Sequence, residues 1–110
     1  MDKDAVAELV AFLSTALRAS GVRIDKLVLF GSQARDCARR GSDVDVIVVS
    51  PDFHDRDIFQ RVEMAAKADR ETIRKFMVPL DLVLMTPEEY ERQTSPIAAM
   101  ARESGIAYVP

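Results

Sequence analysis

The chain has 110 residues, of which 48% are hydrophobic and 30% are charged, and its formal net charge is −3. This is the composition of an ordinary globular protein, and the length predicts one domain, residues 1–110, which buries about two-thirds of its unfolded surface. The negative net charge and the absence of tryptophan argue against a general nucleic-acid-binding protein, because such a protein presents a basic stripe or stacking aromatic side chains.

The sequence shows neither a targeting segment nor a disulfide framework. The start of the chain, Met1 to Asp4, lacks a basic region and no apolar run reaches about 18 residues, so we expect no signal peptide and no membrane span. The single cysteine, Cys37, cannot form an internal disulfide and lies among polar neighbours. These features are typical of a cytoplasmic protein in a reducing compartment.

Residues 3–19 show the periodicity of an amphipathic helix. Apolar side chains recur at the spacing of one helix face, at Val6, Leu9, Val10, Leu13 and Leu17. Asp2 or Asp4 can begin this helix as the N-cap residue, and Gly21 stands where a glycine ends a helix. We expect this helix to cover one face of a sheet and assign it no chemistry.

Two apolar runs follow, with a polar segment between them. Leu27 to Phe30 and Asp43 to Val49 are rich in Val, Leu and Ile and are too short for helices, so we predict two buried strands, the first of them carried by Val22 to Phe30. Gly31-Ser32 marks the end of the first strand. A short helix is predicted from Ser32 to about Cys37, followed by a loop that leads to the second strand.

A longer helix is predicted over residues 57–76, after a polar loop at 52–57. Its pattern allows a break near Asp69. The only histidine, His54, falls in the polar loop without metal-ligand or triad spacing, so we assign it no role. The apolar positions that predict the helix are Ile58, Val62, Ala65, Ala66, Ile73 and Phe76.

A third strand is predicted from Pro79 to Met85, and Pro79 opens it, where a missing N–H is tolerated. A lone acid among apolar strand neighbours is costly to bury unless it is paired or metal-bound, so Asp81 is a candidate functional residue. Strand alternation separates Leu80, Leu82 and Leu84 on one face from Asp81, Val83 and Met85 on the other.

The last part of the chain predicts two further helices and an edge strand. Thr86-Pro87-Glu88-Glu89 is typical of a helix start, with Thr86 as the cap and Glu89 closing a capping box. Ser95-Pro96 repeats this pattern for a last helix that ends at Gly105, and residues 106–109 predict the edge strand.

The second strand opens on two carboxylates. Because strand side chains alternate, Asp43 and Asp45 project to the same side of the sheet, where their charges repel unless a cation lies between them. Mg²⁺ binds one or two carboxylates plus substrate phosphates. Gly31 allows close backbone approach to a ligand, and Ser32 can cap a helix whose N-terminus binds phosphate. Arg35, one turn further on, can reach the same phosphate, so the pattern indicates a nucleoside triphosphate site.

Gly31-Ser32, ten intervening residues and Asp43-Val44-Asp45 resemble the signature of the polymerase-beta-like nucleotidyltransferases. The chain looks like one of the minimal nucleotidyltransferases, and the resemblance covers nearly its whole length. It implies an α+β fold with a small mixed sheet of three to four strands packed with helices, and it makes Asp81 the third carboxylate. One departure is Asp36, where the family commonly has glycine, and we expect this side chain to face solvent.

The resemblance implies a reaction with ATP as the nucleotide donor and two Mg²⁺ ions. Asp43 and Asp45 would hold the first ion at the β- and γ-phosphates, and with Asp81 they would hold the second near the α-phosphate and the acceptor oxygen. Asp81 could also take the acceptor's proton, and pyrophosphate would leave toward Gly31-Ser32.

The acceptor implied by the family is a hydroxyl group, typically of a tyrosine, on a HEPN-domain toxin, which would make this chain an antitoxin. A chain of 110 residues leaves no room for an acceptor-binding domain, so we expect another chain to complete that side of the site.

Two other functions stay open. A non-catalytic antitoxin or assembly module would neutralise its partner by contact alone. A transferase acting on a small molecule such as an aminoglycoside would need a homo-oligomer or a partner to build the acceptor pocket. Asp43 and Asp45 could also be solvated residues at a strand start, and Arg39 and Arg40 a solvated cluster. The base of the nucleotide, the number of units transferred and the oligomeric state are not fixed by the sequence.

Overall fold

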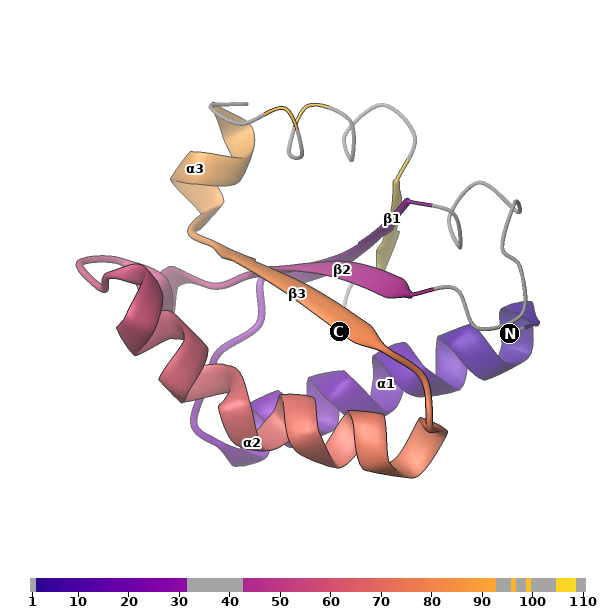
Figure 1. The fold of residues 1–110 in the computed structure, drawn as a ribbon. Coiled ribbons are helices and arrows are strands. Elements are labelled where there is room, and N and C mark those ends of the chain that lie inside the picture. The colour runs from indigo at the N-terminus through magenta and orange to yellow at the C-terminus, as the bar shows by residue number, and fades with distance from the viewer. Residues whose placement is uncertain (1, 32–42, 93–95, 97–98, 100–104, 109–110) are drawn as a thin grey trace.

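The computed structural model describes residues 2–31, 43–92, 96, 99 and 105–108, and Figure 1 shows their arrangement. The helices are α1 (Lys3–Ala19), α2 (Ile58–Phe76) and α3 (Pro87–Glu91), with a short 3-10 helix, η1, at Pro51–Phe53. The strands are β1 (Lys26–Phe30), β2 (Val44–Val49), β3 (Leu80–Met85) and β4 (Ile106–Tyr108). Within the described part of the chain, every helix is too short or too polar to cross a membrane.

The strands form one sheet in the order β3-β2-β1-β4. β1 runs antiparallel to both β2 and β4, whereas β2 and β3 are parallel. A parallel pair needs a crossover connection, and α2 supplies it. This mixed sheet packed with helices confirms the predicted α+β fold, with four strands.

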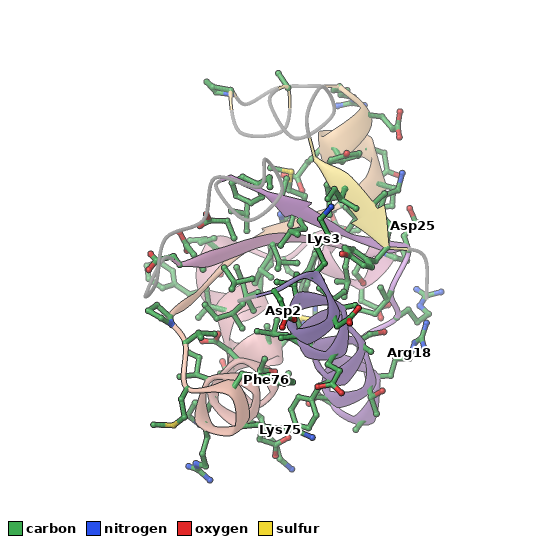
Figure 2. All side chains as sticks on the ribbon, turned by 90° about the vertical axis from the view of Figure 1, so that its right-hand side faces the viewer. Asp2, Lys3, Arg18, Asp25, Lys75 and Phe76 are labelled. Atoms are coloured by element: carbon green, nitrogen blue, oxygen red, sulfur yellow. The ribbon has the colours of Figure 1, made fainter. Side chains whose placement is uncertain are left out.

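The two faces of the sheet are covered unequally. α1 and α2 lie side by side beneath one face (Figures 1 and 2), and the ring of Phe12 in α1 meets that of Phe76 in α2 edge-on at 5.8 Å between centroids. On the opposite face, α3 places Tyr90 over a smaller apolar cluster. The strand residues buried beneath the first face are Leu27, Leu29, Val44, Val46, Val48 and Leu84, and those of the second face are Val28, Phe30, Ile47, Val49 and Met85.

Both predicted ends of the first helix are confirmed. The carboxylate of Asp2 accepts a backbone hydrogen bond in the first turn of α1. At the other end, the N–H of Gly21 donates to the carbonyl of Arg18, and the N–H of Val22 donates to that of Leu17. Gly21 has φ +86°, so these bonds form a Schellman motif, which requires a left-handed residue at this position.

The first predicted strand is too long, because β1 begins only at Lys26. Val22 completes the C-terminal motif of α1, and the backbone N–H and guanidinium of Arg23 bind the carboxylate of Asp52 at 2.8–3.0 Å. These groups are therefore committed to other partners and do not extend the strand. β2 and β3 likewise each begin one residue later than predicted.

The predicted break near Asp69 is wrong, since α2 is continuous from Ile58 to Phe76. Asp57 caps it through a capping box with Gln60, and Met77 ends it with φ +56°. The predicted polar loop before α2 overlaps η1, whose Phe53 is fully buried. The capping box of Thr86 and Glu89 is confirmed, and the predicted last helix falls mostly outside the described residues.

Candidate active site

Two of the predicted carboxylates stand opposite each other in neighbouring strands. In the parallel register of β2 and β3, Asp45 pairs with Asp81. Residues that pair across a ladder project to the same face of a sheet, and Asp43, two residues before Asp45, continues that side. This face is the one opposite α1 and α2, because the alternate residues Val44, Val46 and Leu84 point toward those helices.

Gly31, which directly follows β1, lies against the carboxylate of Asp45. The preceding residue, Phe30, pairs with Asp45 in the antiparallel register. Gly31 has φ +77°, and a Cβ added to it would lie 2.5 Å from Oδ2 of Asp45. Only a residue without a side chain both adopts this backbone conformation freely and leaves room for the carboxylate.

Within the described part of the chain, the charges that act on the carboxylate of Asp45 are negative. Its partial burial, followed by the charges of Asp81 and Asp43, raises its pKa above the ordinary value. The expectation that Asp81 is a buried acid is wrong, since this residue is exposed on an edge strand. Its proximity to Asp45, and not the cost of burying it, is what distinguishes Asp81 from an incidental surface acid.

These oxygens fit a hard divalent cation that substrate helps to hold. Asp45 and Asp81 provide two carboxylates on one face, and a cation between them would relieve the repulsion that raises the Asp45 pKa. In the described ranges, no group of three or more His, Cys, Asp or Glu side chains is close enough to hold a metal ion by itself. Mg²⁺ suits such a pair, because it usually completes its shell with water and substrate phosphates.

The predicted phosphate-binding residues lie partly outside the described residues. Gly31 is described, whereas Ser32 and Arg35 belong to the segment 32–42, which lies outside the described residues. The predicted helix N-terminus after Gly31 and the contact of Arg35 with phosphate therefore stay predictions. His54, which received no role, lies on the surface with its Nδ1 3.2 Å from the carboxylate of Asp55.

One acid near this site was not recognised as functional from the sequence. Asp69 of α2 and Asp81 line the same hollow of 290 Å³ beside the outer edge of β3. Burial and the charge of Asp81 raise the pKa of Asp69, against an opposing effect of Arg70, and its Oδ1 is buried without a hydrogen-bond partner. The signal was present, because Asp69 follows Ala65 by one helical turn on the predicted apolar side.

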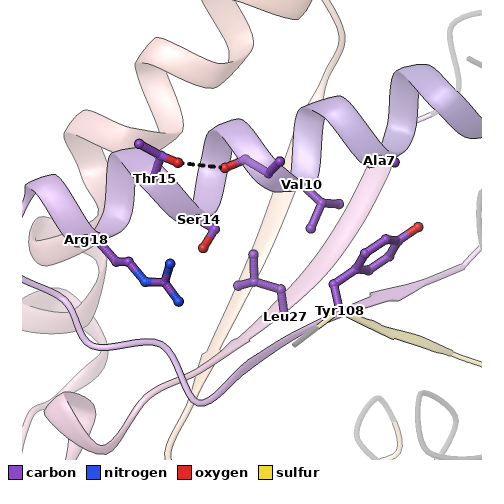
Figure 3. Close-up of a pocket in the computed structure, with 8 residues that line it drawn as sticks. Ala7, Val10, Ser14, Thr15, Arg18, Leu27 and Tyr108 are labelled. Atoms are coloured by element: carbon purple, nitrogen blue, oxygen red, sulfur yellow. Dashed lines mark hydrogen bonds between the residues drawn. The ribbon is translucent and has the colours of Figure 1, made fainter. Parts of the chain in front are cut away.

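A separate hollow of 280 Å³ lies between α1 and the strands β1 and β4 (Figure 3). Arg18 and Ser14 line it from α1, and Tyr108 lines it from β4. Leu27 belongs to the face that α1 and α2 cover, so this hollow lies across the sheet from the carboxylates and contains none of the predicted site residues.

Comparisons with known proteins agree with this architecture. Residues 7–107 match the model of a family described as a nucleotidyltransferase domain, and no curated protein matches the chain. A candidate nucleotidyltransferase from Sulfolobus solfataricus superposes with a TM-score of 0.59 at 19% identity, over 98% of this chain and 88% of that one. A toxin–antitoxin complex with AMP-PNP superposes with a TM-score of 0.61 at 21% identity, over 89% of this chain and 70% of that one. At these identities the two structures establish the fold alone.

Proposed function

This chain belongs to the nucleotidyltransferase domain family, and from that premise we propose that it transfers AMP from ATP to a hydroxyl group of a partner protein in the cytoplasm. The observation that carries the proposal is the pairing of Asp45 with Asp81 on one sheet face, with Gly31 packed against the Asp45 carboxylate. A fold alone would not require an acid pair or a side-chain-free residue at these positions.

In this proposal Asp43, Asp45 and Asp81 hold divalent cations together with the triphosphate. When bound, Mg²⁺ neutralises phosphate charge and makes the acceptor hydroxyl more acidic. The acceptor oxygen forms a bond to the α-phosphorus, the bond from that phosphorus to the β-phosphate oxygen breaks, and pyrophosphate leaves. Asp81 takes the hydroxyl proton, because it is exposed and lies on the outermost strand, where an acceptor can reach it.

The remaining residues position the nucleotide. Gly31 lets backbone N–H groups approach the phosphates, and Ser32 and Arg35 add donors to the triphosphate tail. The chain thus contributes orientation and charge stabilisation, which supply most of the catalysis in phosphoryl transfer.

We further propose that the acceptor is a tyrosine of a HEPN-type toxin and that this chain is its antitoxin. The fold likeness to a toxin–antitoxin complex with AMP-PNP supports this partner class and this nucleotide. The exposure of Asp81 also favours an acceptor that another chain brings to the site over one enclosed in a pocket of this chain.

The test uses the complex of this chain with the protein that co-purifies from its native cell. Incubation with Mg²⁺ and α-labelled ATP should place label on the partner, and Asp45→Asn should lower this labelling at least about a hundredfold. Asp55→Asn is the matched control, because Asp55 is an exposed acid at a loop position with φ +59°, which asparagine tolerates. Equal labelling with Asp45→Asn would exclude the proposed site.

A second candidate is an antitoxin that acts by binding alone. It is favoured by the finding that the described carboxylates do not form a three-ligand metal group. Under this alternative, Asp45→Asn leaves both the complex and the rescue of cell growth from the toxin intact, and no label reaches the partner.

A further inference from the structure

The flank of α2 that faces past the edge of the sheet carries a row of apolar side chains. Phe59 is 80% exposed, Val62 53% and Met77, just after the helix, 82%, and Ile73 is 36% exposed. With Ala66, these residues follow spacings of three, four and seven, which place them in one line along a helix. We call Phe59, Val62, Ala66, Ile73 and Met77 the α2 row.

The position of the α2 row follows from its neighbours. The side of α2 that packs into the core carries Ala65, Ala68 and Thr72. Val62 and Ala66 line the hollow beside Leu82 of β3, which is an edge strand. The row therefore runs parallel to the open edge of the sheet, where a second body can approach it without displacing any described element.

Exposed charges flank the row on its solvent side in a pattern that selects the occupant. Glu63 and Arg70 are both exposed and lie seven residues apart, on the same flank of the row. In a parallel twofold pair, the flank that carries Glu63 and Arg70 in one copy lies across the contact from the same flank of the second copy, so neither charge meets the other. An antiparallel helix, related by a twofold axis near Ala66, places Glu63 near Arg70 of the second copy, twice by symmetry.

The same twofold axis also sets apolar side chains of complementary size opposite one another. It sets Phe59 opposite Ile73 of the second copy, so a large ring meets a smaller side chain at both ends of the contact. At the centre Ala66 meets Ala66 of the second copy, and small residues at a helix crossing allow close approach. The row of 19-residue α2 is about 28 Å long, enough for a continuous helix–helix contact.

We propose that this chain forms a twofold homodimer in which the α2 row packs antiparallel on the α2 row of a second copy. The dimer leaves Asp45 accessible, since this residue projects from the face of the sheet opposite α2. The contact runs close to Asp81, which lines the same hollow as Val62 and Ala66. The proposal does not depend on the proposed transfer reaction, and either can fail without the other.

The first test is sedimentation of the purified chain across a range of concentrations. The expected result is a reversible shift from one to two chain masses. Phe59→Glu should weaken the dimer at least about tenfold, because it buries an unpaired charge at the contact. Phe59 is mostly exposed in a single chain, so the monomer of this variant should unfold at the same temperature as the parent monomer. A chain that sediments as a single copy at every concentration overturns the proposal, and the row would then serve a different protein.

Charge reversal tests the direction of packing. Glu63→Arg and Arg70→Glu should each weaken the dimer several-fold, and the double variant should restore it, because the two charges exchange places across the axis. Glu8→Arg, at an exposed position of α1, is the matched control and should leave the dimer unchanged. A double variant no better than either single variant contradicts the antiparallel arrangement.

Cysteine crosslinking tests the position of the axis. In a Cys37→Ser background, Ala66→Cys should give a disulfide-linked dimer on mild oxidation, whereas Lys67→Cys, directed away from the row, should not. A dimer that crosslinks equally at both positions, or that withstands Phe59→Glu, uses another surface and also overturns the proposal.

Discussion

The face of the sheet opposite α1 and α2 has two ends of opposite character. At one end Ile47 and Val83 join the apolar cluster under α3, and two residues earlier in the same strands stand Asp45 and Asp81. Burial stabilises the apolar end by about 1.5–3 kcal/mol for each large side chain, whereas the acids repel one another. The acidic end therefore lowers stability, as is expected of positions retained for binding or chemistry.

The charged groups of the two ends differ in the same way. Beneath α3, Arg61 forms an ion pair with Glu89 at 2.7 Å and donates to the carbonyl of Leu84 at 3.1 Å. Glu89 also accepts the backbone N–H of Thr86 at 2.8 Å. Here both charges have an opposite or polar partner, whereas at the other end the charges of described residues that act on Asp45 are those of Asp81 and Asp43. This difference marks the acidic end as the place where a cation would be stabilised.

Moving a carboxylate to the covered end should have the largest effect on stability. Ile47→Asp buries an acid at a fully buried position without a partner, which should lower the free energy of unfolding by at least about 4 kcal/mol. Urea unfolding followed by circular dichroism measures this loss. The converse change, Asp45→Val, should leave the chain folded, and equal stability of Ile47→Asp and the parent would contradict the distinction between the two ends.

Gly31→Ala should separate stability from function. Alanine in the left-handed backbone conformation of Gly31 should lower the free energy of unfolding by about 1–2 kcal/mol. Its methyl group would also displace the flexible carboxylate of Asp45. Gly21→Ala is the control, because Gly21 has φ +86° with no atom within 4 Å of an added Cβ. We expect similar unfolding free energies for both variants but loss of partner labelling only for Gly31→Ala. Retained labelling would show that Asp45 need not occupy its present position.

The covered end should also show a modest pH dependence. Burial raises the pKa of Glu89, but hydrogen bonds from Thr86 and Arg61 outweigh it and lower the pKa below the ordinary value of 4.5. Because the folded-state pKa is depressed, Glu89 stabilises the fold above pH 4.5, and this contribution is lost as the pH falls through the folded-state value.

Glu89→Gln measures this contribution. At neutral pH it should lower the unfolding free energy by up to about 1 kcal/mol, since Glu89 is partly exposed and screened by solvent. The difference from the parent should shrink in acid, and Glu88→Gln, at an exposed neighbouring position, is the control. A difference that is independent of pH would exclude the ionised Glu89 as its source.

The smallest expected effect has the opposite sign. Asp45→Asn removes one of three like charges and, without divalent cations, should raise the unfolding free energy by up to about 0.5 kcal/mol after allowance for solvent screening. The residues from Ile47 to the end of β2 are unchanged in this variant, so the change in melting temperature reports the effect of the acid cluster alone. A lower melting temperature would mean that the carboxylate has a stabilising partner in the free chain.

Local sequence signals predicted most elements of the fold. The cap at Asp2, the glycine at position 21 and the capping box of Thr86 and Glu89 all act within a few residues, so their geometry follows from the order of the chain. Element boundaries were less predictable. Val22 is an apolar, β-branched residue, but its N–H completes the C-terminal motif of α1. Asp69 suggested a break in the helix, although the packed face of α2 keeps it continuous.

The sequence by itself determined that Asp43 and Asp45 share a side, because alternation along one strand is a local property. Only the tertiary structure decided that Asp81 pairs with Asp45, since the register between two strands depends on how α2 carries the chain from one to the other. The tertiary structure also decided which apolar residues of α2 lie open to solvent. Periodicity places Phe59 and Ala65 on a helix, but only packing against the sheet and α1 determines which flank is left uncovered.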